Sequence, residues 1–144
     1  MYSKYVFSGH ESFSCRMLWP IKGYDYINDG NSFNDPNSVI MLGVGKNMVA
    51  SIRYWLKALG LTEHDKPSTL AKYLFDEAQG KDRYLESLGT LWLLHFLLVV
   101  LNEATLYNIL FLRYQKERKQ FAKEQVLNFV KRLMAEDDRL KHFN

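Results

Sequence analysis

Residues 46–59 carry the clearest periodic pattern in the chain, and this pattern constrains the fold more than any other feature. On a helix with about 100° per residue, one narrow stripe holds the aliphatic side chains of Val49, Ile52, Leu56 and Leu59. The other side carries small, polar, aromatic and basic side chains, namely Lys46, Asn47, Ala50, Ser51, Arg53, Tyr54 and Lys57. We therefore expect a helix that packs one face on a core, leaves the other face outward and ends at Gly60.

A short helix and a glycine turn are expected just before this segment. Asp35 and Pro36 make a good helix start, with the aspartate as cap and the proline at the first helical position, and this helix should reach about residue 42. Residues 43–45 (Gly-Val-Gly) then form the turn. A short helix, a glycine-containing turn and an amphipathic helix make up a helix-turn-helix, which we place over residues 36–61. A small hairpin at residues 61–66 would be its wing, although Pro67 leaves that hairpin little room.

The outward face of residues 46–59 has the composition that suits the major groove of DNA. Small residues let a helix approach closely, Asn and Arg read base edges, and Lys and the helix N-terminus hold phosphates. We expect DNA contacts from Lys46, Asn47, Arg53, Tyr54 and Lys57. An ordinary amphipathic surface helix stays open as the alternative. A phosphate-loop interpretation of residues 43–46 lacks the first glycine and the hydroxyl of that motif.

The rest of the chain predicts a mainly α fold. Further helices are expected over residues 12–28 (interrupted by Pro20), 66–76, 102–114 and 123–138. Residues 90–101 are apolar on every face, which predicts a buried central helix. Because no repeat, low-complexity tract or dividing linker is present, we expect residues 1–144 to form a single mainly helical domain, with a helical remainder over residues 67–138.

Composition limits the class of protein further. The net charge is only +3, so any attraction of DNA must come from a local patch. The single cysteine, Cys15, excludes a disulfide framework and indicates a reducing compartment. The start of the chain lacks the apolar stretch of a signal peptide, and the longest apolar run, residues 91–101, is shorter than the roughly 20 residues that span a bilayer. We expect a cytoplasmic protein without a membrane segment.

A second basic patch lies near the end of the chain. Lys116, Arg118 and Lys119 lie between the aromatic residues Tyr114 and Phe121, and Lys123 follows just beyond them. Cations among aromatic rings can hold phosphates while the rings stack on bases, so we include the three cations among the candidate DNA contacts. The alternative is a solvated connector.

One local group of residues has the composition of a catalytic site. His10, Glu11 and Arg16 combine an imidazole, a carboxylate and a guanidinium, which could support acid-base work and clamp a phosphate. The alternative is a turn in which Glu11 caps the following helix and Arg16 pairs with it. We identify no cofactor and no metal site, since no spacing of His, Cys, Asp and Glu resembles a zinc site.

Three ordered motifs resemble a known bacterial family. They are residues 7–16 (FSGHESFSCR), 42–55 (LGVGKNMVASIRYW) and 84–95 (YLESLGTLWLLH). Together they resemble the SspB-like family of DNA phosphorothioation and phage-defence operons, long labelled a family of unknown function (DUF4007). The resemblance covers nearly the whole chain.

The resemblance implies a functional setting. The family member with an assigned role is regarded as a DNA-nicking partner for single-strand sulfur modification, and members are usually about twice as long as this chain. It implies an N-terminal domain that binds DNA and other subunits of a modification system. It also implies a divalent metal if the nicking chemistry resides in this part. The alternative function is an interaction module that bridges modification subunits without contacting DNA.

Overall fold

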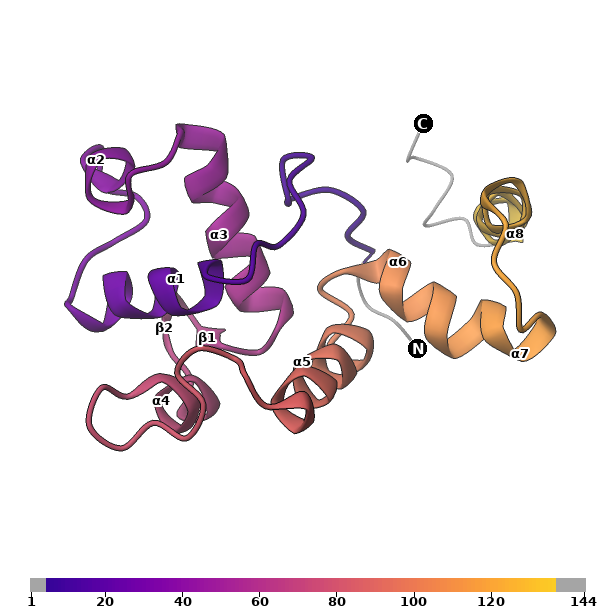
Figure 1. Ribbon diagram of the computed structural model, residues 1–144. Helices are drawn as coiled ribbons and strands as arrows, with labels where there is room; N and C mark the ends of the chain where they lie inside the picture. Colours follow the sequence, from indigo (N-terminus) through magenta and orange to yellow (C-terminus); the bar gives the residue numbers. More distant parts are fainter. Residues whose placement is uncertain (1–4, 137–144) are drawn as a thin grey trace.

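Helices dominate the protein. The structure, a computed structural model, describes residues 5–136. In chain order its elements are α1 (Trp19–Asn28), α2 (Ser38–Leu42), α3 (Lys46–Ala58), β1 (Thr62–Glu63), β2 (Lys66–Pro67), α4 (Thr69–Phe75), α5 (Leu88–Val100), α6 (Thr105–Asn108), the π-helical η1 (Ile109–Tyr114), α7 (Gln115–Glu117) and α8 (Lys123–Glu136) (Figure 1). This order confirms the mainly α fold class.

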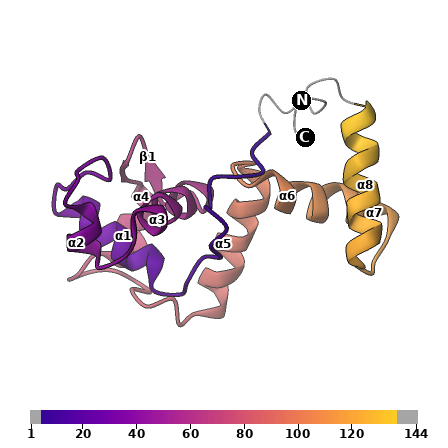
Figure 2. The same cartoon turned by 90° about the horizontal axis from the view of Figure 1, so that it is seen from above.

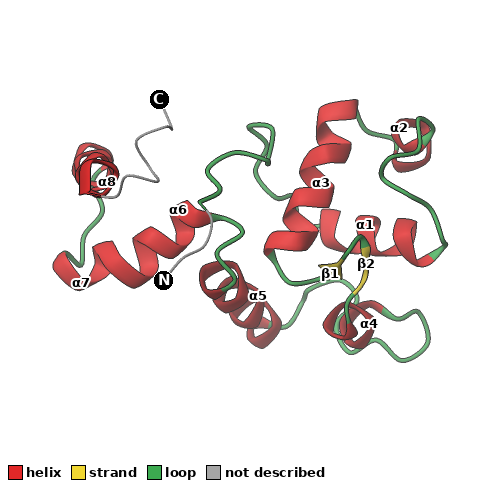
Figure 3. Ribbon diagram, turned by 180° about the vertical axis from the view of Figure 1, so that it is seen from behind, coloured by secondary structure: helices red, strands yellow, loops and turns green. Residues whose placement is uncertain are grey.

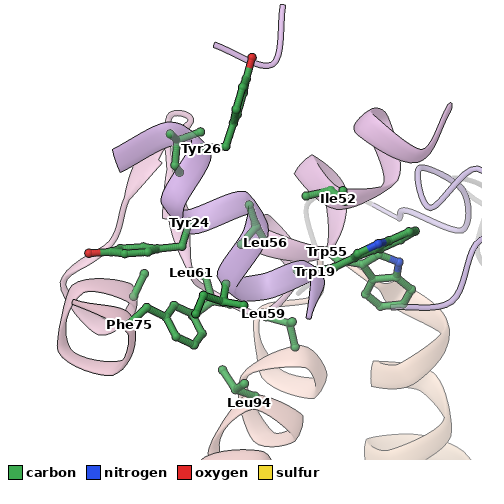
Figure 4. Close-up of a cluster of buried hydrophobic side chains, with 14 of the residues drawn as sticks. Trp19, Tyr24, Tyr26, Ile52, Trp55, Leu56, Leu59, Leu61, Phe75 and Leu94 are labelled. Carbon is green, nitrogen blue, oxygen red and sulfur yellow. The ribbon is translucent and has the colours of Figure 1, made fainter. Parts of the chain in front are cut away.

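The main core lies where α1 crosses α3. The stripe expected to face inward on α3 is buried, with Ile52 and Leu56 almost completely excluded from solvent. Figure 4 shows these side chains gathered with aromatic residues of α1 and with Phe75 of α4. The periodicity of residues 46–59 therefore predicted the inward face correctly.

The first helix begins later than predicted. α1 starts at Trp19, so the expectation of a helix from residue 12 is wrong. Residues 10–13 instead form a tight reverse turn, in which the Phe13 N–H donates to the His10 carbonyl at 2.7 Å. Glu11 and Ser12 have φ values of 49° and 63° there, which a helix cannot accommodate. Pro20 lies in the first turn of α1, where its missing N–H leaves no helical bond unmade.

The central apolar helix is not buried as predicted. α5 buries only Leu94, Leu98 and Val99, while the exposed fraction is 68% for Leu88 and 65% for Trp92. The described residues cover α5 on one side only (Figures 1 and 2). A helix that is apolar on every face can be buried, but the neighbouring elements decide how much of its surface is covered.

The C-terminal part of the described chain extends away from the main core. α6, η1 and α7 form one rod, and α8 packs on it through Phe129 (Figure 2). The helix expected from residue 102 begins at Thr105, and residues 137 and 138 of the helix predicted to follow lie outside the described residues. Within residues 5–136, none of the helices alone has the length and apolarity to cross a membrane; α5 and Thr105–Glu117 qualify only as a pair bent by 97°.

Candidate nucleic-acid interface

A glycine turn sets the direction of α3. Gly43 ends α2 in the left-handed conformation (φ 61°), and its N–H donates to the Ile40 carbonyl at 3.1 Å. Gly45 is extended and precedes the first residue of α3 without any side-chain cap. The amides in the first turn of α3 therefore have no side-chain acceptor, which leaves them able to bind an anion.

The first half of α3 is open to solvent on its outward side. Lys46, Asn47 and Ala50 are all exposed, and Ala50 lies one turn after Lys46 and Asn47 on the same side of the helix. This face combines a cation, an amide and a methyl group, which together permit close approach to a polyanion. The structure thus brings two of the predicted DNA contacts, Lys46 and Asn47, onto one open surface.

The second half of α3 has its cations paired with carboxylates. The β1–β2 hairpin turns through His64 and Asp65, both with positive φ, as a two-residue turn between antiparallel strands requires. This turn places Asp65 beside α3. The Arg53 guanidinium donates from Nε to Asp65 Oδ1 at 2.8 Å and from Nη2 to Oδ2, and its Nη1 donates to Asn34 Oδ1 at 3.1 Å.

Lys57 has a partner of the same kind. Its Nζ lies 2.9 Å from Oε2 of Glu103, which comes from the loop between α5 and α6. More than half of the Lys57 side chain is nevertheless exposed. Arg53 and Lys57 are therefore held in place by acids from two other segments, not extended freely toward solvent.

A hollow of about 900 Å³ opens beside this half of α3. Its lining comes from α3, the hairpin, the start of α4 and the end of α5, which Figure 3 shows, together with Gly9 of the N-terminal segment and Glu103 of the loop after α5. Its charged residues are Arg53, Lys57, Glu63, Asp65 and Glu103, with apolar walls that include Leu97 and Leu101. With two cations against three carboxylates, the charged lining has a net charge of −1 when His64 is neutral.

The N-terminal segment packs across α3 and partly covers Tyr54. The His10 ring lies 6.0 Å from the Tyr54 ring and 6.1 Å from the Trp55 ring, and Trp55 Nε1 donates to the Phe13 carbonyl at 2.9 Å. Burial, with smaller contributions from Tyr107 and Glu103, raises the pKa of Tyr54 to about 12. Its hydroxyl therefore stays protonated at neutral pH.

One residue expected on the outward face is wrongly placed by the helical wheel. Ser51 is fully buried, and its Oγ has no hydrogen-bond partner. It lies one turn before Tyr54 and Trp55, the two residues that His10 of the N-terminal segment contacts. A wheel drawn for one helix cannot represent a second segment that covers its flank.

The structure does not assemble His10, Glu11 and Arg16 into one site. The Arg16 guanidinium stacks over the Trp19 ring at 5.4 Å, and no ion pair within residues 5–136 joins it to Glu11. Glu11 is exposed, whereas His10 Nδ1 is buried without a partner. The alternative in which Glu11 caps a helix is also wrong, because α1 starts eight residues later. Across the described part of the chain, no group of three or more His, Cys, Asp and Glu residues could hold a metal ion.

The second basic patch lies at the other end of the molecule from α3 (Figures 1 and 2). Lys116, Arg118 and Lys119 are exposed around the end of α7. Tyr114, expected to stack on bases, is instead buried, and its hydroxyl contacts the Gln120 carbonyl and Gln125 Oε1, each at 3.2 Å. This ring stabilises the contact between η1 and α8. Because α3 and the end of α7 lie far apart, the two groups of predicted DNA contacts do not form one face.

Sequence reasoning did not identify the acids that pair with α3. Asp65 carried a local signal, since an aspartate tolerates the left-handed backbone of a two-residue turn. Glu103 and Asn34 carried none. Their positions depend on the path of loops that are distant from α3 in sequence.

Together these features define a small helical protein in which an amphipathic helix, after a glycine turn, borders a charged hollow. The chain belongs to the family described as protein of unknown function (DUF4007), whose model matches residues 7–143. This match confirms the resemblance seen in the three sequence motifs.

Two solved structures are similar to part of the chain. The "Magnesium ion-bound SspB crystal structure" is 39% identical with a TM-score of 0.58, and the match covers 65% of this chain and 30% of that one. The "SspB crystal structure" is 40% identical with a TM-score of 0.59, covering 64% and 31%. The matched region thus spans less than a third of the solved chains. A search of the curated proteins found no match.

Proposed function

We propose that this chain is a DNA-binding part of a bacterial DNA phosphorothioation and phage-defence system, with α3 as the helix that enters the major groove. α1, α2, the glycine turn, α3 and the β1–β2 hairpin follow one another in the order of a winged helix-turn-helix. The observation that carries the proposal is the exposed outward side of the first half of α3, which begins at an N-terminus without a side-chain cap. The similarity to SspB supports the biological setting.

Each residue on the open face has a role that suits DNA. Lys46 and the first amides of α3 would hold a phosphate, while Asn47 would form paired hydrogen bonds with a base edge. Ala50 would allow the helix to approach closely. Arg53, Tyr54 and Lys57 would lie nearer the flanking backbone, and Lys116, Arg118 and Lys119 would contact DNA separately, from the other end of the molecule.

A salt titration of duplex binding tests the proposal. We expect Lys46→Ala to weaken binding of a fluorescent duplex and to flatten the dependence of log K on log salt by about 0.9, the effect of one lost phosphate contact. Lys72→Ala, which removes the same charge from an exposed position on α4, is the matched control and should change the slope little. Equal effects of the two variants would contradict a specific role for α3.

The proposal is limited to binding. His10, Glu11 and Arg16 face different surroundings, so their geometry gives no support to nicking by these residues. Magnesium-dependent nicking of supercoiled plasmid that is lost in His10→Ala would contradict this limit.

An uncovered apolar face on α5 favours a second function, docking of another subunit of the same system. The exposed Leu88, Leu91, Trp92 and Phe96 follow the i, i+3, i+4, i+8 spacing of one helix side. With His95 and Phe111 the first three line an apolar hollow of about 330 Å³. Exposed patches of this kind mark interaction sites.

Substitution of the α5 face would test this docking. We expect Trp92→Ser combined with Phe96→Ser to abolish capture of a purified partner subunit while leaving duplex binding and the melting temperature nearly unchanged. A large loss of thermal stability would instead indicate that this face packs within the chain.

A further inference from the structure

Two acidic residues form ion pairs with cations of the proposed DNA-binding helix. Arg53 and Lys57 lie four residues apart on α3 and line the same hollow. Asp65 accepts hydrogen bonds from Nε and Nη2 of Arg53, and Glu103 accepts from the Lys57 ammonium group at 2.9 Å. A two-point contact of this kind is also how a guanidinium binds a phosphate.

We propose that Asp65 and Glu103 set the affinity of this face for DNA. Their carboxylates pair with Arg53 and Lys57 at the positions that DNA phosphates would otherwise occupy. The inference rests on the proposed function. It assigns the hollow beside α3 to the sugar-phosphate backbone and makes the two acids its intramolecular competitors. DNA would have to displace both carboxylates before the second half of α3 could contribute to binding.

Exposure of the pairs makes this exchange feasible. About 40% of the Asp65 side chain and 31% of the Glu103 side chain are accessible, as are 42% of Arg53 and 55% of Lys57. Ion pairs this exposed contribute little to folding stability. Their main effect is therefore electrostatic competition, because each carboxylate neutralises a cation that would otherwise be available to a phosphate.

Asp65 comes from the β1–β2 hairpin and Glu103 from the loop after α5, and the packing of these two segments fixes where the carboxylates lie. The short β1–β2 ladder and the left-handed conformation of His64 and Asp65 direct the Asp65 carboxylate at α3. Glu103 follows the end of α5, so its position depends on how α5 packs. The two pairs thus join α3 to the hairpin and to α5.

Neutralising the acids one at a time tests the inference. Asp65→Asn keeps a residue that tolerates positive φ, and Glu103→Gln keeps the side-chain length, so both variants should fold. Each freed cation that gains a phosphate should steepen the salt slope by about 0.9, which corresponds to roughly eightfold tighter duplex binding at 0.1 M salt. Glu63→Gln is the matched control, because Glu63 is exposed in the same hollow but has no ion pair in residues 5–136.

The outcomes separate this inference from the proposed function. Tighter binding in Asp65→Asn that disappears on adding Arg53→Gln would support it, with circular dichroism checking the fold of each variant. An equal gain in Glu63→Gln, or no gain in either acid variant while Lys46→Ala still weakens binding, would overturn the inference alone. Absence of duplex binding by the wild-type chain and every variant would overturn both proposals.

Discussion

The ring of Tyr54 packs directly against the backbone of Gly9. A Cβ added at residue 9 would lie 2.6 Å from Cδ2 of Tyr54 and 2.9 Å from Cε2, which is too close for any ordinary contact. Gly9 also has a φ of +132°, which residues with a side chain rarely adopt. This contact joins the N-terminal segment to α3 at the edge of the hollow.

Gly9→Ala should therefore destabilise the protein by roughly 1–3 kcal/mol, through overpacking and backbone strain. Urea denaturation would measure the loss. The cost should be smaller in a Tyr54→Ala background, since the ring that the methyl group meets is then absent. An equal cost in both backgrounds would show that the contact with the ring has no energetic consequence.

The glycine turn before α3 offers a matched pair of substitutions. Gly43→Ala should cost about 1 kcal/mol, because residue 43 has a φ of +61°. Gly45→Ala should be nearly neutral, since residue 45 is extended and a Cβ there meets nothing within 4 Å. Chemical denaturation of both variants would check the order, and a larger loss for Gly45→Ala would contradict the turn geometry.

Cys15 should react slowly with alkylating reagents. Burial raises the pKa of its thiol from 9.0 to about 11, so the thiolate fraction near pH 8 falls about a hundredfold. We expect alkylation by iodoacetamide at pH 8 to be correspondingly slow in the folded chain and to accelerate in urea. Equal rates in the folded and unfolded chain would show that Cys15 is not protected.

Asp82 should make stability depend on acid pH. A hydrogen bond from the Thr90 side chain, together with N–H donors of Glu86 at 2.8 Å and Ser87 at 3.1 Å, lowers the pKa of its carboxyl below the usual value. A lowered pKa in the folded state contributes stability above the unfolded pKa of about 3.9, and this contribution is lost as the pH falls through the folded value.

Asp82→Asn should therefore destabilise the chain at pH 6–7, because its carboxamide accepts these hydrogen bonds less strongly. The difference from wild type should shrink below about pH 4. Urea midpoints measured from pH 7 to pH 3 would follow this difference. A difference that stays constant over the whole range would show that the Asp82 charge is not what stabilises the start of α5.

Short-range patterns determined the local elements of this protein. The spacing of Val49, Ile52 and Leu56 predicted the buried side of α3 because helical periodicity depends only on residues within a few turns. The glycine turn before α3 was likewise readable from local backbone preferences, whereas the hairpin after it had only a weak local signal and includes Pro67, which was expected to limit it. The start of α1 was not, because a stretch compatible with a helix forms a turn at Glu11 and Ser12 instead.

Tertiary structure alone decided which surfaces are covered and which charges are neutralised. Trp92 is exposed although its helix is apolar all round, and Ser51 is buried although its wheel position faces outward. Arg53 and Lys57 were readable as cations, but their carboxylate partners come from a hairpin turn and from the loop after α5. Burial and ion pairing depend on contacts between segments that are distant in the chain, which no local pattern of residues encodes.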